Sequence, residues 1–315
     1  MAGQMTLFEK IWRQHVVADL GDDRALIHID RHVLQEVTSL QAFDALRKRK
    51  LPIHSLGLTY AVIDHSVSTM PGRTAATFEP TRERIEAMQK NCRDFAIDLF
   101  DIDDPAQGIV HVIAPELGIT LPGSTLVCAD SHSATSGGLG AWAWGIGTTQ
   151  VLQVLATQTL IQKKPQTMRV DFSGSIGPGV FAKDLILYLI GRHGIAAGTG
   201  FVVEYAGPVI RAMPIEARMT MCNMSIEFGA RSGLIAVDDQ TLQYLSGRRF
   251  APQGVAWEKA AQSWRSLCSD EAAGFDREIG IDCSAVKPQI SWGTTPQDVI
   301  AVDEPTPLPA SAADP

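Results

Sequence analysis

Short apolar runs rich in β-branched residues alternate along this chain with segments of helical periodicity. In the first half, the apolar runs are residues 25–29, 58–63, 108–113 and 124–129. The helical patterns there cover residues 40–48, 82–95 and 149–162. Strands that are separated by helices pair in parallel, and the helices then cover both faces of the sheet. The sequence therefore predicts an α/β fold with largely parallel sheets in three-layer domains.

A break in this pattern at Lys163-Lys164-Pro165 divides the chain. After the break the alternation starts again, with predicted strands at 167–172, 201–205 and 233–238 and predicted helices at 182–191, 215–228 and 257–267. A chain of 315 residues with 45% hydrophobic residues is long enough to build two packed cores. We therefore predict one domain over residues 1–164 and a second domain over residues 165–291.

The two ends of the chain have distinct patterns. Thr6 and Glu9 have the spacing of a capping box, and apolar residues follow at helical spacing, so an amphipathic helix is expected near the N-terminus. The last twelve residues, EPTPLPASAADP, hold four prolines and show no apolar periodicity. Residues 292–315 are therefore predicted to be a linker toward a third domain that this chain lacks.

Charge and cysteine content argue against several classes of function. The formal net charge is -8, so neither nucleic acid nor an anionic membrane is an expected partner. The five cysteines are an odd number without a C-x-x-C pair, which indicates neither a disulfide framework nor a zinc site. The N-terminus lacks the apolar core of a signal peptide, and no run reaches the roughly 18 apolar residues of a membrane span. This pattern is typical of a cytoplasmic protein.

Two clusters of acidic and imidazole side chains directly follow predicted strands. Asp64-His65 follows the strand at 58–63, and Asp130-Ser131-His132 follows the strand at 124–129. Ligands of open α/β sheets bind at the carboxyl ends of strands, and a carboxylate beside a histidine can fix its tautomer and raise its pKa. The two clusters therefore predict a proton-transfer site. The alternative is that each Asp caps a turn and each His is structural.

Three further segments are candidates for ligand contacts. Residues 137–147 hold five glycines and are predicted to open a helix whose N-terminus attracts an anionic ligand, with plain packing as the alternative role. Asn223 and Glu227 are four residues apart on a predicted helix, so they are expected to share one face. Gln35 begins the polar cluster 35–38, which we expect at the end of the strand at 25–29.

Taken in order, these segments resemble the aconitase superfamily, and within it the large subunits of 3-isopropylmalate dehydratases. The stretches that carry the resemblance include IDHSVST (63–69), VCADSHSAT (127–135) and MCNMSIEFGARSGLIA (221–236). Further matches are residues 29–47, 107–112, 145–151 and 154–160, with a weaker one at 292–296. The resemblance implies an aconitase-like fold and a heteromeric hydro-lyase of leucine biosynthesis. Such an enzyme moves a hydroxyl group between adjacent carbons of a malate-type di- or tricarboxylate.

The resemblance also implies roles for single residues. The residues that match catalytic groups around the departing hydroxyl are Asp64, His65, Asp130, Ser131 and His132. Gln35 matches a substrate-contacting position. Asn223 matches a second-domain residue that binds near the substrate, and Glu227 matches a catalytic residue near the water of a 4Fe-4S cluster. The base that removes the carbon-bound proton is implied to be a serine of a separate small subunit.

The resemblance implies a 4Fe-4S cluster for the complete enzyme and not for this chain by itself. The family's cluster cysteines lie in a later G-S-C-T-N segment and in a C-x-x-C pair, and this chain contains neither. We therefore expect no metal ligands among its residues, no cluster bound to the chain by itself, and no dehydratase activity of the chain by itself.

The sequence leaves the substrate and two alternative functions open. Ser66, Ser136, Phe201 and Thr295 depart from the residues usual in the family's motifs. A related dehydratase for another malate derivative and a binding or regulatory paralogue without a cluster are therefore alternatives. Asp130-Ser131-His132 also matches the D-x-H motif of two-metal phosphoesterases, but their later G-N-H-[DE] and G-H-x-H elements are absent.

Overall fold

The structure is a computed structural model that describes residues 4–307. Its first sheet has five parallel strands in the order β5-β4-β3-β6-β7. Their bounds are β3 Arg31–Gln35, β4 Thr59–Val62, β5 Asp98–Phe100, β6 Thr125–Cys128 and β7 Trp142–Gly145. Because β3 lies between β4 and β6, the carboxyl ends of these three strands are neighbours at one edge of the sheet.

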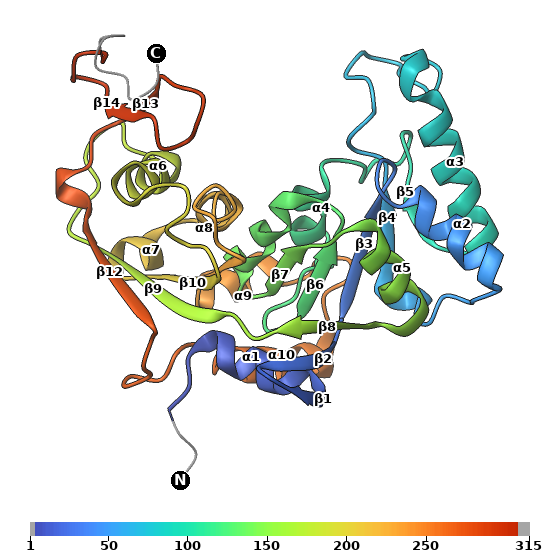
Figure 1. Cartoon of the computed structure of the whole chain (residues 1–315), viewed down its shortest axis with the longest axis horizontal. Coiled ribbons are helices and arrows are strands. Elements are labelled where there is room, and N and C mark those ends of the chain that lie inside the picture. Colours follow the sequence, from blue (N-terminus) through green and yellow to red (C-terminus); the bar gives the residue numbers. More distant parts are fainter. Residues whose placement is uncertain (1–3, 308–315) are drawn as a thin grey trace.

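Helices cover both faces of the first sheet (Figure 1). On one face, Leu34 and Val127 share a core with α2 (Leu40–Arg49), α3 (Glu79–Phe95) and α5 (Thr148–Thr157). On the other face, Val33 and Cys128 pack with α4 (Val110–Glu116). The 3-10 segment η2 (Ser131–Leu139) contacts α4, β6 and β7. The alternation of side chains along each strand thus gives three layers.

The second sheet has four parallel strands in the order β11-β10-β9-β12. Their bounds are β9 Gln166–Ser173, β10 Phe201–Ala206, β11 Ser232–Leu234 and β12 Arg277–Asp282. The helices of its core are α6 (Ala182–His193), α7 (Pro208–Ala212) and α8 (Ile215–Asn223). The predicted α/β fold with mostly parallel sheets is therefore confirmed.

A smaller antiparallel sheet lies below the first two sheets in Figure 1. It has the order β1-β2-β8, with bounds β1 Val16–Gly21, β2 Arg24–His28 and β8 Thr159–Lys163. The helix α1 (Leu7–His15) precedes it, and its capping box is formed as predicted, since the Thr6 side chain accepts from the Glu9 N–H. Two short 3-10 segments, η1 (Leu56–Leu58) and η3 (Cys283–Ala285), complete the connections.

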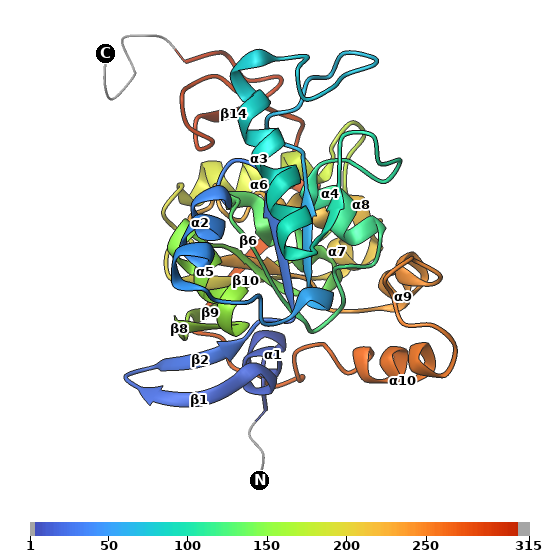
Figure 2. The same cartoon turned by 90° about the vertical axis from the view of Figure 1, so that its right-hand side faces the viewer.

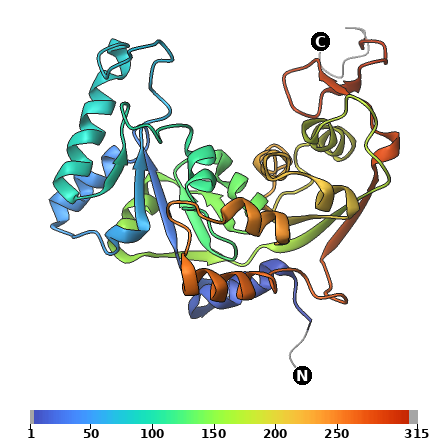
Figure 3. The same ribbon diagram turned by 180° about the vertical axis from the view of Figure 1, so that it is seen from behind.

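A segment of the second half returns to the first core. Figures 2 and 3 show α10 (Gly254–Trp264) at the same end of the molecule as α1, and α9 (Asp239–Leu245) precedes it in the chain. Trp264 and Leu267 belong to the core that also contains α1. Lys10 Nζ donates to the Cys268 carbonyl oxygen at 2.7 Å, which fastens the connection behind α10 to α1. The division into domains at residues 164 and 165 stays a prediction.

The run at residues 108–113, predicted as a strand, forms the helix α4 instead. Val110, Ile113 and Ala114 have helical spacing and are buried together against the sheet. The Asp64 carboxylate accepts the N–H of Val110 at 2.8 Å and so satisfies one free donor at the start of the helix. Tertiary packing therefore outweighs the strand propensity of the β-branched residues.

Two predicted helices end earlier than expected. The helix predicted to reach residue 162 ends at Thr157, because Gln158 has a left-handed φ of 56° and residues 159–163 pair with β2 as strand β8. The helix predicted to reach residue 228 ends at Asn223, and turns follow.

The glycine-rich stretch and the C-terminal segment also differ from the prediction. Residues 142–145 within this stretch form strand β7, which was not predicted, whereas α5 begins at Thr148 with Gly147 as its N-cap, close to the predicted start. Residues 289–291 and 299–301 form the strands β13 (Gln289–Ser291) and β14 (Val299–Ala301), an antiparallel hairpin that contacts α6. The predicted linker thus holds a strand in its first part, and residues 308–315 lie outside the described part of the chain.

Among residues 4–307, no helix combines the length and the apolar character that crossing a bilayer requires.

Candidate active site

The two predicted clusters meet at the carboxyl edge of the first sheet. His65 Nδ1 lies 2.6 Å from Asp64 Oδ1, and His65 Nε2 lies 2.5 Å from Asp130 Oδ2. One imidazole therefore bridges the ends of β4 and β6 across the intervening strand β3. The hydrogen bonds to Asp130 and Asp64 raise the pKa of His65 to about 10, so this side chain is protonated at neutral pH.

A second histidine, His111 of α4, joins the same carboxylate. Its Nε2 lies 2.6 Å from Asp130 Oδ1, so Asp130 accepts from two imidazoles. Burial by itself would raise the pKa of Asp130, but the hydrogen bonds from His111 and His65 outweigh it and hold the pKa well below its usual range. Asp130 is therefore ionised at every physiological pH.

His111 was not among the residues singled out by the sequence. The segment 108–113 is predicted as a strand, and a strand at this position does not direct the His111 side chain toward Asp130. The helical spacing of Val110, Ile113 and Ala114 was the signal that could have shown a helix there, and with it a different direction for His111.

The second half of the chain contributes one carboxylate to the site. Ser131 Oγ lies 2.9 Å from His132 Nδ1, and His132 Nε2 lies 2.8 Å from Glu227 Oε1. The two oxygens of Glu227 differ, because Oε2 is buried and has no hydrogen-bond partner among the described residues. His132 is about one-third exposed and can therefore be reached by a ligand.

Asn223 and Glu227 both approach the 3-10 segment η2, although not as one helix face. Asn223 is the last residue of α8, and Glu227 lies in the turns behind it. Asn223 Nδ2 donates to Thr135 Oγ1 at 2.8 Å, and this hydroxyl donates to the His132 carbonyl oxygen at 2.7 Å. Asn223 thus supports the backbone of His132, whereas Glu227 contacts its ring.

Gln35 lies at the end of β3, one strand later than the sequence placed it. Its side chain is buried, and Nε2 donates to Thr38 Oγ1 at 2.6 Å and to the Ala129 carbonyl oxygen at 3.1 Å. Its Oε1 accepts the N–H of Val37 at 2.5 Å. The expected substrate contact of Gln35 stays a prediction, since these partners all belong to the protein.

The glycines of η2 serve packing. A Cβ at Gly137 would lie 1.8 Å from the carbonyl oxygen of Gly233, and one at Gly138 would lie 2.7 Å from the backbone nitrogen of Met219. These glycines therefore allow η2 to approach β11 and α8 at backbone distance, which brings His132 to Glu227. The packing alternative therefore applies to Gly137 and Gly138, and the anionic ligand expected at the helix start stays a prediction.

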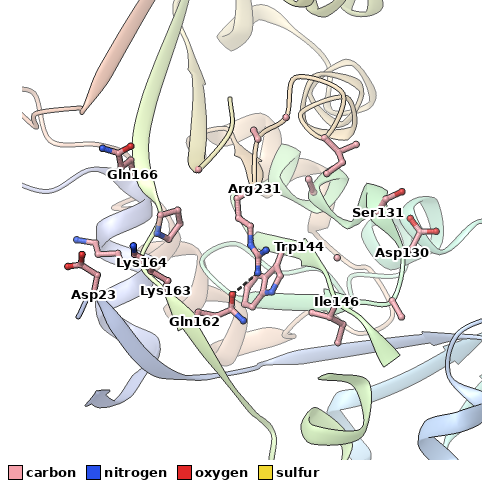
Figure 4. A pocket seen from close by; sticks show the side chains of 18 residues that line it. Asp23, Asp130, Ser131, Trp144, Ile146, Gln162, Lys163, Lys164, Gln166 and Arg231 are labelled. Atoms are coloured by element: carbon pink, nitrogen blue, oxygen red, sulfur yellow. Dashed lines mark hydrogen bonds between the residues drawn. The ribbon is translucent and has the colours of Figure 1, made fainter. Parts of the chain in front are cut away.

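A cavity of about 940 Å³ adjoins this cluster. Figure 4 shows Asp130 and Ser131 at one end, with Lys163, Lys164 and Arg231 along its other walls. Arg231 Nη2 donates to Gln162 Oε1, a neutral partner, at 2.7 Å. The sequence interpretation treated the two lysines as a domain break and assigned no role to Arg231. Their cations provide a setting for a carboxylate-bearing ligand.

The cysteines of the described residues do not form an iron-sulfur site. Cys92, Cys128, Cys222 and Cys283 are buried in separate elements, and Cys268 is exposed. Burial raises the pKa of the Cys128 and Cys222 thiols well above the usual range, whereas a cluster needs converging thiolates. The residues present therefore do not fit a 4Fe-4S cluster by themselves.

One group of side chains within residues 4–307 is close enough to share a metal ion, namely Glu36, Asp64 and His65. The Glu36 oxygens already accept backbone N–H groups, and His65 bridges two carboxylates. Asp130 and His132 of the D-x-H motif have different partners, His111 and Glu227. This arrangement does not support a two-metal phosphoesterase.

Comparison with known proteins decides the family. The family model described as the aconitase family (aconitate hydratase) matches residues 9–315. The chain belongs to the aconitase family. This result confirms the resemblance deduced from the motifs.

A curated aconitase-family relative refines the comparison. The chain is 53% identical over 310 residues to 3-isopropylmalate dehydratase large subunit 1 of Bradyrhizobium diazoefficiens. The match covers 98% of this chain and 65% of that relative, so the chain spans about two-thirds of the relative's length. The crystal structure of Thermococcus kodakaraensis aconitase X in its holo form overlaps with 82% of this chain and 58% of its own chain. Its TM-score of 0.45 and identity of 12% are too low to support any further argument.

Proposed function

We propose that this aconitase-family chain is the N-terminal part of the large subunit of a 3-isopropylmalate dehydratase, in which it supplies the acid-base groups of dehydration and rehydration. The observation that carries the proposal is Asp130, which is ionised and accepts from both His65 and His111 beside the cavity. The identity of 53% to a large subunit of this enzyme supports the substrate class.

Removing a hydroxyl group from a carbon requires that its oxygen gain a proton or a positive partner as it leaves. His65 keeps its ring proton at neutral pH, because Asp64 and Asp130 stabilise the imidazolium. Its side chain is about one-third exposed, so a substrate hydroxyl can approach it. Both ring nitrogens of His65 already contact carboxylates, so His65 would stabilise the departing hydroxide by its positive charge.

His132 offers a second proton-transfer group. Its Nε2 lies within hydrogen-bond distance of Glu227 Oε1, and its Nδ1 faces the Ser131 hydroxyl. A carboxylate on one side of the ring and a hydroxyl on the other allow the ring to accept a proton at one nitrogen and release one at the other. Rehydration needs such a group to take a proton from the incoming water.

The substrate class follows from charge. A malate-type acid carries two or three carboxylates, and the cavity beside Asp130 is lined by Lys163, Arg231 and Lys164, the last of which pairs with Glu9 at 3.4 Å. Asp23 and Asp130 are the acidic residues of its wall, and both oxygens of Asp130 already accept hydrogen bonds from imidazoles. The cavity therefore suits a polycarboxylate better than a neutral or cationic ligand.

The complete enzyme would add a 4Fe-4S cluster and a small subunit. The cluster, when bound, supplies a Lewis acid for the substrate hydroxyl and carboxylate. The cysteines among the described residues do not fit a cluster by themselves, so its ligands would come from the rest of the enzyme. The relative's name, large subunit, supports a small-subunit partner.

The test is reconstitution of the enzyme from parts. This chain is co-expressed with the remaining C-terminal segment of the Bradyrhizobium relative and with a matching small subunit, and hydration of an alkene dicarboxylate is followed anaerobically. We expect turnover when all three parts are present, and none when this chain is left out. Turnover without this chain, or none with all three parts despite assembly and a bound cluster, would reject the proposal and favour a binding or regulatory role.

A further inference from the structure

Glu36 is a buried acidic residue that the proposed mechanism does not use. It follows β3 directly, and its side chain is inaccessible to solvent. Among the described residues no cation lies within 4.0 Å of its carboxylate, and the protonated ring of His65 lies within 4.8 Å. A buried charge without an ion-pair partner is costly unless hydrogen bonds compensate it. The hydrogen-bond partners of Glu36 therefore indicate its role.

The partners of Glu36 are three consecutive backbone N–H groups at the end of β4. Oε2 accepts from Asp64 at 3.2 Å, and Oε1 accepts from His65 at 2.9 Å and also from Ser66. Successive N–H groups that converge on one anion form a nest, which fixes the backbone dihedrals of the turn. The turn that presents the Asp64 carboxylate and the His65 ring is therefore built around the carboxylate of Glu36.

The same stretch of chain holds the neighbouring strand end. Gln35 Nε2 and Thr38 Oγ1 both donate to the Ala129 carbonyl oxygen at 3.1 Å, directly before Asp130. Because β3 lies between β4 and β6, residues 35–38 brace one strand end on each side. These contacts set the separation between Asp64 and Asp130, and the His65 ring spans this separation.

We propose that Glu36 is a positioning residue, which holds the turn 64–66 so that His65 contacts Asp64 and Asp130 at once. The proposal deepens the proposed function, but its geometry holds whatever reaction the site performs. It also gives a role to Glu36 in the polar cluster 35–38, in which the resemblance assigned a role to Gln35 alone.

The test uses the full 315-residue chain with glutamine at position 36, Glu36→Gln. Glutamine keeps the shape but replaces one acceptor oxygen by an NH₂ group, which faces a backbone N–H. We expect amide hydrogen exchange of Asp64, His65 and Ser66 to accelerate about tenfold or more, because a hydrogen bond to a charged acceptor is lost. We also expect the NMR titration of the His65 ring to move down by about one pH unit or more, as its two carboxylate contacts loosen.

Glu204→Gln is the matched control. Glu204 on β10 is also a buried glutamate and accepts from Ser269 Oγ at 2.6 Å, but it belongs to the other sheet. This variant should leave the exchange of residues 64–66 and the His65 titration unchanged. If Glu36→Gln fails to fold, Glu36→Asp replaces it, with the same changes expected because the shorter side chain cannot reach all three N–H groups.

Two results would overturn the proposal. One is unchanged exchange at residues 64–66 with an unchanged His65 titration in the Glu36 variant. The other is an equal response in the Glu204 variant, which would reveal a general loss of stability. Neither readout involves turnover, so the outcome is independent of whether the proposed dehydratase activity is correct.

Discussion

His132 and Asp130 have different parts in the proposed site, since His132 is a proton-transfer group and Asp130 is the ionised carboxylate that holds His65 and His111. In the complete enzyme, His132→Ala or Asp130→Asn should lower turnover by about a hundredfold or more, because the first removes an acid-base group and the second removes the charge that keeps His65 protonated. Stability should change little for His132, whose ring is about one-third exposed. Steady-state rates would show this, with His54→Ala as a control at an exposed histidine whose ring contacts Ser55. Control-like rates in both site variants would remove these residues from the mechanism.

Glu227 combines one bonded and one free oxygen. Glu227→Gln keeps the shape and the acceptor for His132 Nε2 but removes the negative charge. We expect catalysis to suffer more than folding, because the charge serves proton exchange and not packing. Thermal melts measured beside rates decide between the two. A variant that unfolds at room temperature while its folded fraction turns over normally would make Glu227 structural.

His32 provides a residue-scale prediction of pH dependence. Its ring is completely buried in β3 without a hydrogen-bond partner among the described residues, and burial lowers its pKa from 6.5 to about 3. The unfolded chain therefore binds a proton below pH 6.5 that the folded chain refuses until about pH 3. The contribution of His32 to stability consequently falls as the pH drops through this window.

Replacing His32 should weaken this acid sensitivity. We expect His32→Leu to lose less stability than the natural chain between pH 7 and about pH 4.5, since an apolar side chain has no proton to take up. Urea unfolding at several pH values measures the difference. Parallel curves for the two proteins would show that His32 is solvated or paired in solution.

At the scale of elements, the contact of η2 with β11 and α8 joins the two halves of the site. Gly137→Ala should destabilise the protein by about 1–3 kcal/mol or more, because the added Cβ would meet the backbone of Gly233. Gly274→Ala is the control, since Gly274 lies in a loop and a Cβ there meets nothing within 4 Å. Chemical denaturation of both variants tests this. Equal effects would mean that the backbone at Gly137 can shift away from β11.

Some helices and strands could be predicted correctly from local sequence patterns. The strands β4, β6, β9 and β10 and the helices α1, α2 and α6 were predicted because each carries its own periodicity or cap. The helix α4 was predicted as a strand because its β-branched residues are visible in the local sequence. The sheet surface that the helix covers is formed by distant residues and appears only in the tertiary structure. Helix α5 ended early for a related reason, because β8 gains its pairing from β2, more than a hundred residues earlier in the chain.

At the scale of the whole molecule, the cysteines determine what the chain can do by itself. We predict that the purified 315-residue chain binds no iron-sulfur cluster and has no dehydratase activity, because its thiols lie in separate elements. Anaerobic reconstitution with iron and sulfide, followed by the charge-transfer absorbance and a hydration assay, checks this. A stoichiometric cluster with turnover from the chain alone would contradict the prediction.

The sequence by itself determined the class of fold, the family, and the Asp64-His65 and Asp130-Ser131-His132 clusters. These features are local, since periodicity, caps and adjacent residues at strand ends need no knowledge of distant contacts. The tertiary structure alone decided that His111 shares Asp130, that Glu227 reaches His132 across 95 residues, and that Glu36 holds the turn of Asp64 and His65. Such pairings depend on which strands become neighbours and on how closely the backbones approach, and no local pattern encodes either.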